Sequence, residues 1–396
     1  MPDLAYILGD PALRLWGLTS KQRLLRQLRA AGITTVVDDP SQVPGDATLV
    51  VVNSAYLFEQ RTIAGLCRQS SGVLECPRDS GIAAAVAPAG RALEFAALVA
   101  ARTRPIAPGV PVLRPHSLAH YDDHLRRHEP PLLEPIRADN NAGLESILYG
   151  NSYKGITDCV TKWLWPRPAR LLVRGCANAG ISPNAVTLVG LGLVLLAGYL
   201  FAHGAYAGGL LCGWIMTLLD TVDGKLARVT VQSSALGHAL DHGIDIVHPP
   251  VWYVLWGYGL GSDVAGGSEF LPSMNWLIVG GYLAGRAFEG MFAGLGSCSM
   301  FAWRPFDAYF RLITARRNPC LIILSITLLA RRPDWGLAGV AAWTTLSSAV
   351  LGVRLLYATT VRIRRGRLSS WLSDPSAAVA HTGAYRTFSG TRGAYD

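Results

Sequence analysis

Four aspartates in strongly apolar sequence constrain this chain more than any other feature. Asp220, Asp223, Asp241 and Asp245 lie within the stretch 220–245. On a helix, residues three or four apart share a face, so the first two aspartates form one pair and the last two another. A carboxylate at bilayer depth costs at least about 2.5 kcal/mol, which makes each of them a functional hypothesis. Two helices packed antiparallel across the intervening turn would direct all four carboxylates into one cavity.

Such a cavity predicts a site for divalent cations. Hard oxygen ligands suit Mg²⁺, Mn²⁺ or Ca²⁺ rather than zinc, and carboxylates that bridge two metals clamp a diphosphate during displacement at phosphorus. Gly224, Ala227 and Gly237 are small enough to admit a bulky anionic ligand, and Arg228 is available to neutralise a phosphate. Two alternatives stay open: buried acids that only pair with basic residues, and a polytopic protein that uses the aspartates for cation passage.

These eight residues form the pattern D-x2-D-G-x2-A-R-x8-G-x3-D-x3-D, which resembles the complete signature of the CDP-alcohol phosphotransferase family. The resemblance implies an integral membrane enzyme with six helices. It would displace CMP from a CDP-alcohol, such as CDP-diacylglycerol or CDP-inositol, by attack of an alcohol hydroxyl on the β-phosphorus. The implied setting is phospholipid or polar-lipid biosynthesis, and the family also implies a homodimer.

Residue roles follow from the same resemblance. Asp220, Asp223 and Asp241 match positions that hold two divalent cations, Mg²⁺ or Mn²⁺, while Asp245 matches one that both touches metal and serves as general base. Positions that bind the CDP-alcohol correspond to Pro183, Asn184, Thr187, Gly224, Ala227, Arg228, Ser234 and Gly237.

A basic segment, 301–318, supplies candidates for binding the acceptor. Arg316 and Arg317 are positioned to bind a phosphate on the acceptor, as arginines do in relatives that use inositol phosphate. Positive residues also mark the inner side of a membrane protein, so a purely topological role stays open. The same two interpretations apply to Arg286, Glu289, Arg304 and Arg311.

The distribution of apolar residues supports a membrane body. Half of the 396 residues are hydrophobic and 16% are charged. Residues 1–180 have the composition of soluble protein, whereas residues 184–360 form a series of long apolar segments. The fifth of these segments is the weakest, because its clean apolar run is too short to cross a bilayer alone. Six spans are expected near 184–204, 207–227, 235–258, 274–297, 311–330 and 335–358.

Charge placement predicts the orientation. Lys and Arg flank the expected spans mainly on one side, with Arg331 and Arg332 between the fifth and sixth spans as the exception. Both chain ends and the aspartate site should therefore be cytoplasmic, with the spans in the cell inner membrane. The net charge of +9 comes without interleaved aromatic and basic residues, which favours a lipid bilayer and anionic substrates over nucleic acid. Residues 153–184 combine Lys and Arg with Trp and Leu, which predicts a helix lying on the anionic leaflet. Seven scattered cysteines and the lack of a signal-peptide pattern agree with a cytoplasmic head.

The first 130 residues alternate strand and helix signals, which predicts βαβ units and a parallel sheet with helices on both faces. The order of pieces resembles a nucleotidyltransferase-like domain, in which a glycine-rich loop after the first strand cradles a nucleotide triphosphate. The corresponding loop, 9–21, retains Gly9, Arg14 and Lys21 but lacks the second glycine of the cradle.

An acidic metal ligand is also missing from this head, because Asn53 and Ser54 stand where it is expected. Without an anionic ligand there, metal-assisted nucleotidyl transfer loses its support. We therefore predict a degenerate head with a structural or regulatory role. The alternative is a bifunctional enzyme whose head also makes the CDP-activated donor.

The complete layout resembles the bifunctional inositol-phosphate cytidylyltransferase and di-inositol-phosphate-phosphate synthase proteins. The expected fold class is an α-helical polytopic membrane protein preceded by an α/β nucleotidyltransferase-like soluble domain. The expected domains are a degenerate head over 1–130, a linker and juxtamembrane amphipathic helix over 131–183, a six-helix membrane domain over 184–362 and a disordered tail over 363–396.

Overall fold

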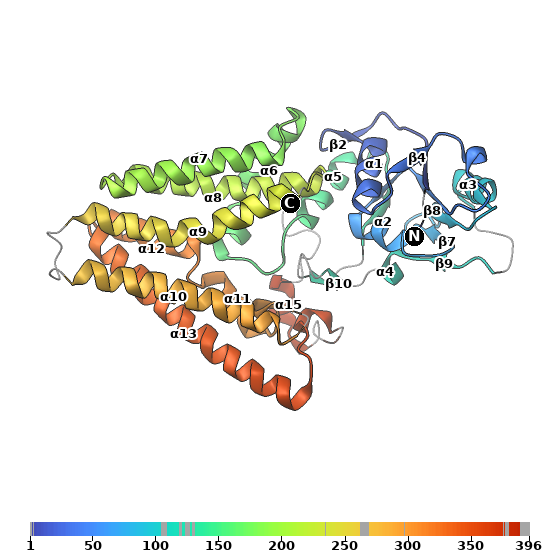
Figure 1. The fold of residues 1–396 in the computed structure, drawn as a ribbon. Coiled ribbons are helices and arrows are strands. Elements are labelled where there is room, and N and C mark those ends of the chain that lie inside the picture. The colour runs from blue at the N-terminus through green and yellow to red at the C-terminus, as the bar shows by residue number, and fades with distance from the viewer. Residues whose placement is uncertain are drawn as a thin grey trace.

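A computed structural model of the chain shows an α/β head followed by a long helical body (Figure 1). The head lies at one end of the molecule, and the long helices of the body run away from it. The structure describes residues 2, 4–103, 109–118, 121–122, 127–128, 131–233, 235–261, 269–296, 298–374, 376 and 380–388.

The head is built on a mixed sheet with the strand order β4-β1-β5-β8-β7-β9. β1 pairs in parallel with β4 and β5, but β8 is antiparallel to both β5 and β7, so the prediction of a parallel sheet was wrong. A parallel pair needs a crossover of about a dozen residues, and the 76–81 connection between β7 and β8 is too short for one. The strands span Leu4–Leu8 (β1), Thr35–Val37 (β4), Leu49–Asn53 (β5), Gly72–Glu75 (β7), Ile82–Ala87 (β8) and Val112–Leu113 (β9).

Helices cover both faces of the sheet, as the alternating pattern predicts. The side chains of β5 point alternately to the two faces, so Val50 and Val52 pack with the helices α1 (Ser20–Ala30) and α2 (Gln60–Leu66). Leu49 and Val51 pack on the other face, where α3 (Ala92–Ala101) contributes Phe95 and Val99.

Helices in the body lie where spans are expected, but six spans are not confirmed. Among the residues that the structure describes, α7 and α13 are each long and apolar enough to cross a membrane. α11 and α12, bent by 42°, make a third span if the pair is counted as one. The helices are α7 (Pro183–Ala202), α8 (Tyr206–Val229), α9 (Ala235–Leu260), α10 (Phe270–Ala293), α11 (Pro305–Ile313), α12 (Arg317–Leu329) and α13 (Pro333–Arg365).

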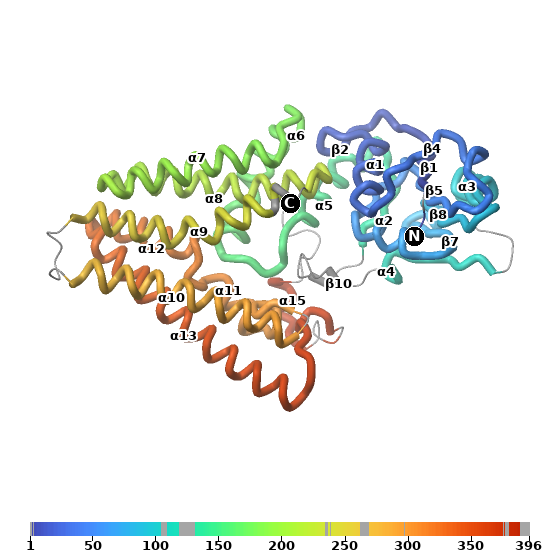
Figure 2. Tube along the Cα trace, viewed as in Figure 1, coloured from blue at the N-terminus to red at the C-terminus, as the bar shows by residue number. Residues whose placement is uncertain are grey.

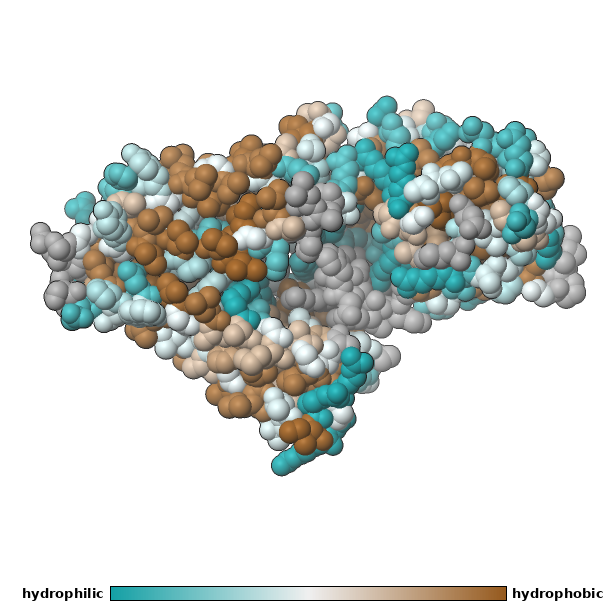
Figure 3. Space-filling model, viewed as in Figure 1, coloured by the Kyte–Doolittle hydropathy of each residue, from teal (hydrophilic) through white to brown (hydrophobic). Residues whose placement is uncertain are grey.

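The body helices pack in an order that places α7 against both α8 and α9, and α13 against both α10 and α12 (Figure 2). Trp252 of α9 lies in the central core and donates a hydrogen bond from its indole nitrogen to the carbonyl of Val194 on α7 at 2.9 Å. Hydrophobic side chains also gather on the outside of the body (Figure 3). On α7 these include Leu188, Leu195 and Tyr199. An apolar outer face of this kind is the surface that a lipid bilayer covers.

Between the head and α7, α6 (Pro166–Asn178) is amphipathic. Ala169 and Val173 are buried against the body, whereas Leu171 is 75% exposed. Trp163, just before α6, is also exposed. This two-faced helix fits the predicted position on a membrane surface.

The tail after α13 is packed over its described residues, so the prediction of a disordered tail was wrong for them. Leu368, Trp371, Leu372 and Phe388 are buried in one cluster with residues of the body. They belong to the segment before and within the short helices η4 (Trp371–Ser373) and α15 (Thr382–Phe388). A few large apolar side chains anchor the segment, and an average composition rich in Ser, Gly and Ala conceals them.

Phe388→Ala is expected to lower the free energy of unfolding by about 3–5 kcal/mol, because it removes a buried aromatic ring. The ring packs edge-on against Tyr309 with 5.0 Å between centroids, and the ammonium of Lys162 lies 5.3 Å from its centre. Thermal unfolding in detergent measures the effect. Arg386→Ala, at an exposed position of the same helix, is the matched control. Equal melting temperatures for the two variants would contradict a packed tail.

Candidate active site

The signature aspartates come together at the end of the body that faces the head. Asp220 and Asp223 lie near the end of α8, and Asp241 lies near the start of α9. One carboxylate oxygen from each of the three lies within 4.8 Å of the others, as a shared cation requires. All of these ligand atoms are hard oxygens, so the cluster fits Mg²⁺ or Mn²⁺.

α7 holds the two aspartate helices in register, since it packs against both. Ser182 caps α7 by accepting a hydrogen bond from the backbone N–H of Ala185, and Pro183 occupies its first turn. One turn further on, the hydroxyl of Thr187 donates to Asp223 at 2.6 Å. This bond fixes the orientation of a carboxylate in the cluster, as hydrogen-bond partners of metal ligands do.

Asp245 lies beside the three-carboxylate cluster and is joined to it by Arg317. The guanidinium of Arg317, at the start of α12, donates to Asp245 and to Asp220 at 2.6 Å each. The break between α11 and α12 directs this side chain into the site, where it is only 12% exposed. Arg317 therefore offsets part of the negative charge of the aspartates in this structure. Tyr282 of α10 holds α9 next to Asp245, because its hydroxyl donates to the carbonyl of Ile246 at 2.8 Å.

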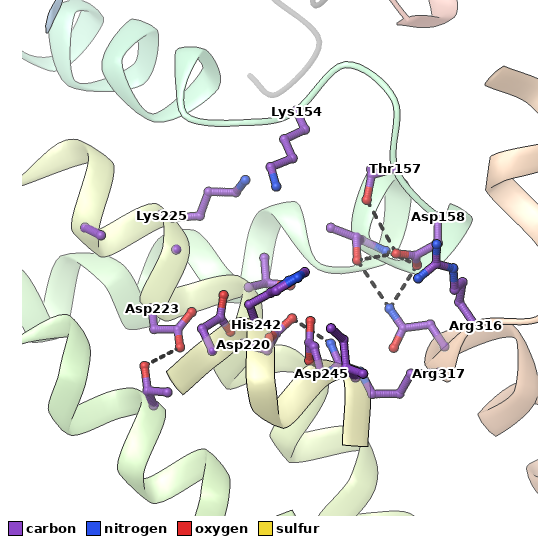
Figure 4. A pocket seen from close by; sticks show the side chains of 18 of the residues that line it. Lys154, Thr157, Asp158, Asp220, Asp223, Lys225, His242, Asp245, Arg316 and Arg317 are labelled. Carbon is purple, nitrogen blue, oxygen red and sulfur yellow. Dashed lines mark hydrogen bonds and ion pairs between the residues drawn. The ribbon is translucent and has the colours of Figure 1, made fainter. Parts of the chain in front are cut away.

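Basic side chains line the neighbouring side of the cavity. Lys225 and Arg228 of α8 both donate to the carbonyl of Ser152, at 3.1 and 2.9 Å. The ammonium of Lys225 lies 3.5 Å from the ring centre of Tyr153, and Lys154 extends toward the same region (Figure 4). A Cβ atom at Gly224 would approach the Arg228 guanidinium to 3.3 Å, so glycine leaves room for this packing.

A second basic group lies toward α10, α11 and α12. Arg286 donates to Glu289 at 3.2 Å, and Arg316 also pairs with Glu289. Arg311 lies in the same part of the cavity wall. Glu289 thus pairs with two of these arginines, and the charge of Arg311 acts on Asp158.

Asp158 anchors the loop that closes this part of the site. It accepts hydrogen bonds from the side-chain amide of Asn318 at 2.9 Å and from the hydroxyl of Thr161 at 2.8 Å. Burial alone would raise the pKa of the Asp158 carboxyl. The Arg311 charge and these hydrogen bonds outweigh burial and hold that pKa below its usual value.

One cavity of about 510 Å³ unites these groups. The structure brings the predicted site residues to its wall with two exceptions. Ser234 lies outside the described residues, and Arg304 lies over the rings of Trp303 and Tyr357 instead of lining the cavity. The predicted residues that line it are Pro183, Asn184, Thr187, Asp220, Asp223, Gly224, Ala227, Arg228, Gly237, Asp241, Asp245, Arg316 and Arg317.

Several lining residues were not predicted as site residues. Lys225 carries the same signal as the aspartates, a charge within an apolar helix, and that signal would have found it. Asp158 and Asn318 are 160 residues apart, so no local spacing connects them. Tyr282 lies in an apolar helix, where a tyrosine is ordinary.

The loop of the head that resembles a nucleotide cradle is occupied by internal contacts. Arg14 donates to the carbonyl of Gly17 at 3.0 Å, within a hairpin of β2 (Arg14–Leu15) and β3 (Leu18–Thr19). Asn53 and Ser54 are also engaged, since Asn53 accepts from the Ala55 N–H at 2.9 Å and Ser54 donates to the Leu8 carbonyl at 2.7 Å.

Comparison with known proteins agrees with this site. The chain has the helices of a membrane protein and a carboxylate-lined cavity at one end of them. The family model for CDP-alcohol phosphatidyltransferases matches residues 180–285, the region that carries the aspartates. Archaetidylinositol phosphate synthase from Pyrococcus horikoshii is 32% identical over 190 residues, which cover 46% of this chain and 89% of that protein. The chain belongs to the CDP-alcohol phosphatidyltransferase family.

A second relative is more distant. Cholinephosphotransferase 1 from Danio rerio is 28% identical over 241 residues, which cover 56% of this chain and 54% of that protein. The chain thus spans about half the length of that relative. The names of both relatives place the family among transferases of phospholipid biosynthesis.

Proposed function

We propose that this protein is a membrane phosphotransferase that displaces CMP from a CDP-alcohol by attack of an alcohol acceptor. The observation that carries the proposal is the convergence of the signature on one cavity. Asp220, Asp223 and Asp241 cluster there, and the described residues that match the donor-binding positions of the family line the same wall.

Asp220, Asp223, Asp241 and Asp245 would hold two divalent cations. Bound cations would supply positive charge against the diphosphate of the donor and the departing CMP. The protein contributes the remaining positive charge through Arg228, which lies one turn from Gly224 on the cavity wall. Gly224 and Gly237 have no side chains, which leaves room for the nucleotide at the cavity wall.

Asp245 acts as the general base in this proposal. It lies at the edge of the aspartate cluster, and its side chain is 39% exposed to the cavity. Its carboxylate takes the proton of the acceptor hydroxyl while the acceptor oxygen bonds to the β-phosphorus. The bond from that phosphorus to CMP breaks, and CMP leaves with the electron pair. Arg317 holds the Asp245 carboxylate in place from α12.

The acceptor that fits best is a phosphorylated alcohol. Arg286, Arg311 and Arg316 line the cavity together with Glu289 and Asp158, and arginine suits phosphate recognition. The archaeal relative supports this choice by name, since it is a synthase of a phosphorylated inositol lipid. The name of the fish relative indicates transfer of a choline phosphate and specifies no acceptor.

We place the head and the cavity mouth on the cytoplasmic side of the cell inner membrane. The support is the common location of the head, the amphipathic α6 and the mouth at one end of the body. Cysteine labelling of intact cells and of inverted membrane vesicles tests the orientation. A homodimer stays a prediction from the family resemblance.

CMP release by the purified protein in detergent tests the proposal. CDP-diacylglycerol and other CDP-alcohols are offered with Mg²⁺ or Mn²⁺ against inositol phosphate, glycerol phosphate, inositol and serine. Release stimulated by a phosphorylated acceptor is the expected result. Release with no donor and acceptor pair would overturn the proposed reaction, and stimulation by inositol or serine alone would overturn the proposed acceptor class.

Arg316→Gln is expected to raise the KM for the phosphorylated acceptor about tenfold and to leave the KM for the donor unchanged. The reason is the loss of one charged hydrogen bond to phosphate. Arg364→Gln, at an exposed position of α13, makes the same charge change away from the cavity and is the control. An unchanged acceptor KM in Arg316→Gln would remove this arginine from the acceptor site.

A further inference from the structure

A tryptophan of the head is inserted into the core of the helical body. Trp16, between β2 and β3, is 1% exposed and lies in a cluster with Val173 of α6 and Leu226 of α8. Its backbone N–H donates to the Glu145 carboxylate at 3.0 Å, and its indole N–H donates to the Glu145 carbonyl at 3.1 Å. Its ring stacks on Tyr149 with 5.7 Å between centroids. The loop that resembles a nucleotide cradle is therefore a docking contact in this chain.

A second contact from the head reaches the end of the signature helix. Arg26, on α1, donates to the carbonyl of Thr230 at 2.6 Å, just beyond the last turn of α8. With its amide oriented so that the oxygen faces Arg26, Gln232 accepts two further hydrogen bonds, at 2.9 and 3.1 Å. One guanidinium of the head thus holds both ends of the 230–232 turn.

This turn contains a strained residue. Val231 has φ 51°, in the left-handed region that β-branched residues rarely adopt. Such a conformation persists only where its surroundings hold it. The Gln232 N–H closes the end of α8 by donating to the Ala227 carbonyl at 2.8 Å, and Arg26 holds the outer side of the same turn.

The turn belongs to the wall of the reaction cavity. Gln232 and Ser233 line that cavity, and Arg228 lines it one turn earlier. The turn follows α8, which carries Asp223, and precedes α9, which carries Asp241. The last carbonyls of a helix carry partial negative charge, which would repel an anionic donor at this rim. A cation that binds these carbonyls reduces the repulsion.

We propose that Arg26 is a positioning residue for the donor site, and that the head holds the 230–232 turn in the shape that accepts a CDP-linked donor. The inference rests on the proposed function, because it assigns the head a role in that reaction. It gives the degenerate head a task other than donor synthesis. Loss of the contact lets the turn relax, which lowers affinity for the donor without removing any group that reacts.

Arg26→Ala tests the proposal in the full-length protein. The expected result is a KM for the CDP-alcohol that is about tenfold higher, with kcat unchanged, because a charge-assisted hydrogen bond holding the turn is lost. Arg26→Lys should recover part of the affinity, since lysine keeps the charge but not the fork of donors. Arg29→Ala, at an exposed position of the same helix, is the matched control and should behave like wild type.

Two further measurements separate this proposal from the proposed function. Calorimetric binding of CDP with Mg²⁺ and hydrogen exchange of the amides in 228–233 need no turnover. Weaker CDP binding and faster exchange in Arg26→Ala would support the positioning role even if no acceptor released CMP. Unchanged CDP binding and unchanged exchange would overturn it, whatever the activity of the wild type.

Gln232→Ala breaks part of the same contact from the body and covers the case in which Arg26→Ala does not fold. If the two residues act through one contact, the double variant should lose little more donor affinity than whichever single variant loses more. A loss of donor affinity in the double variant equal to the sum of the two single losses would overturn the coupling through this turn.

Discussion

Asp245→Asn is expected to lower kcat for CMP release by about 10²–10⁴-fold, the usual contribution of a general base. Asparagine has nearly the same shape and keeps an oxygen that accepts the hydrogen bond from Arg317. It does not take a proton from the acceptor. The loss should therefore appear in kcat, whereas the variant should still bind CDP. Initial rates over a range of donor concentrations, together with calorimetric binding of CDP, separate the two effects.

Asp139→Asn, at an exposed position outside the cavity, makes the same chemical change and should retain full activity. A rise in the KM for the donor with little change in kcat would contradict the role of Asp245 as base. Asp245 would then serve only as a ligand for metal or donor.

Asp223→Asn is expected to reduce CMP release by at least about 10²-fold, because it removes a charged ligand from the cation cluster. Its carboxylate is one of the three whose oxygens lie within 4.8 Å of one another. Mn²⁺ binding measured by electron paramagnetic resonance should weaken in parallel. Chelation of divalent cations should silence the wild type, and added Mg²⁺ should restore it.

Thr187→Val provides a graded comparison for the cation cluster. It keeps all carboxylates and removes the 2.6 Å hydrogen bond to Asp223, so Mn²⁺ affinity should fall about tenfold.

Normal Mn²⁺ binding in Asp223→Asn would place the cation elsewhere. Activity of the wild type in excess chelator would contradict a metal-dependent reaction.

The cavity was predictable from the sequence to the extent that helix geometry is local. Asp220 and Asp223 lie three residues apart on one helix, so their common face follows from the helical repeat alone. The bridge from Arg317 to Asp245 joins segments 72 residues apart, and no periodic pattern specifies it. It depends on how α12 packs in the body, which is a tertiary property.

The fold was predictable where one physical requirement dominates. Long apolar runs located the body helices, and the weakness predicted for residues 311–330 corresponds to the break between α11 and α12. The sheet was predicted less well, because the alternation of strands and helices does not reveal that the β7–β8 connection is short. For the described part of the tail the prediction was wrong, because composition averages over the few residues, such as Trp371 and Phe388, that anchor it.

The docked tryptophan imposes an order on biosynthesis. Glu145, which pairs with Trp16, follows it by 129 residues, and Leu226 is farther still along the chain. The core around the Trp16 indole is therefore incomplete until the second long helix of the body has been made. The head and the membrane helices thus complete one shared core late in translation, and a nascent chain stalled before α8 lacks Leu226, one of the residues that bury its first tryptophan.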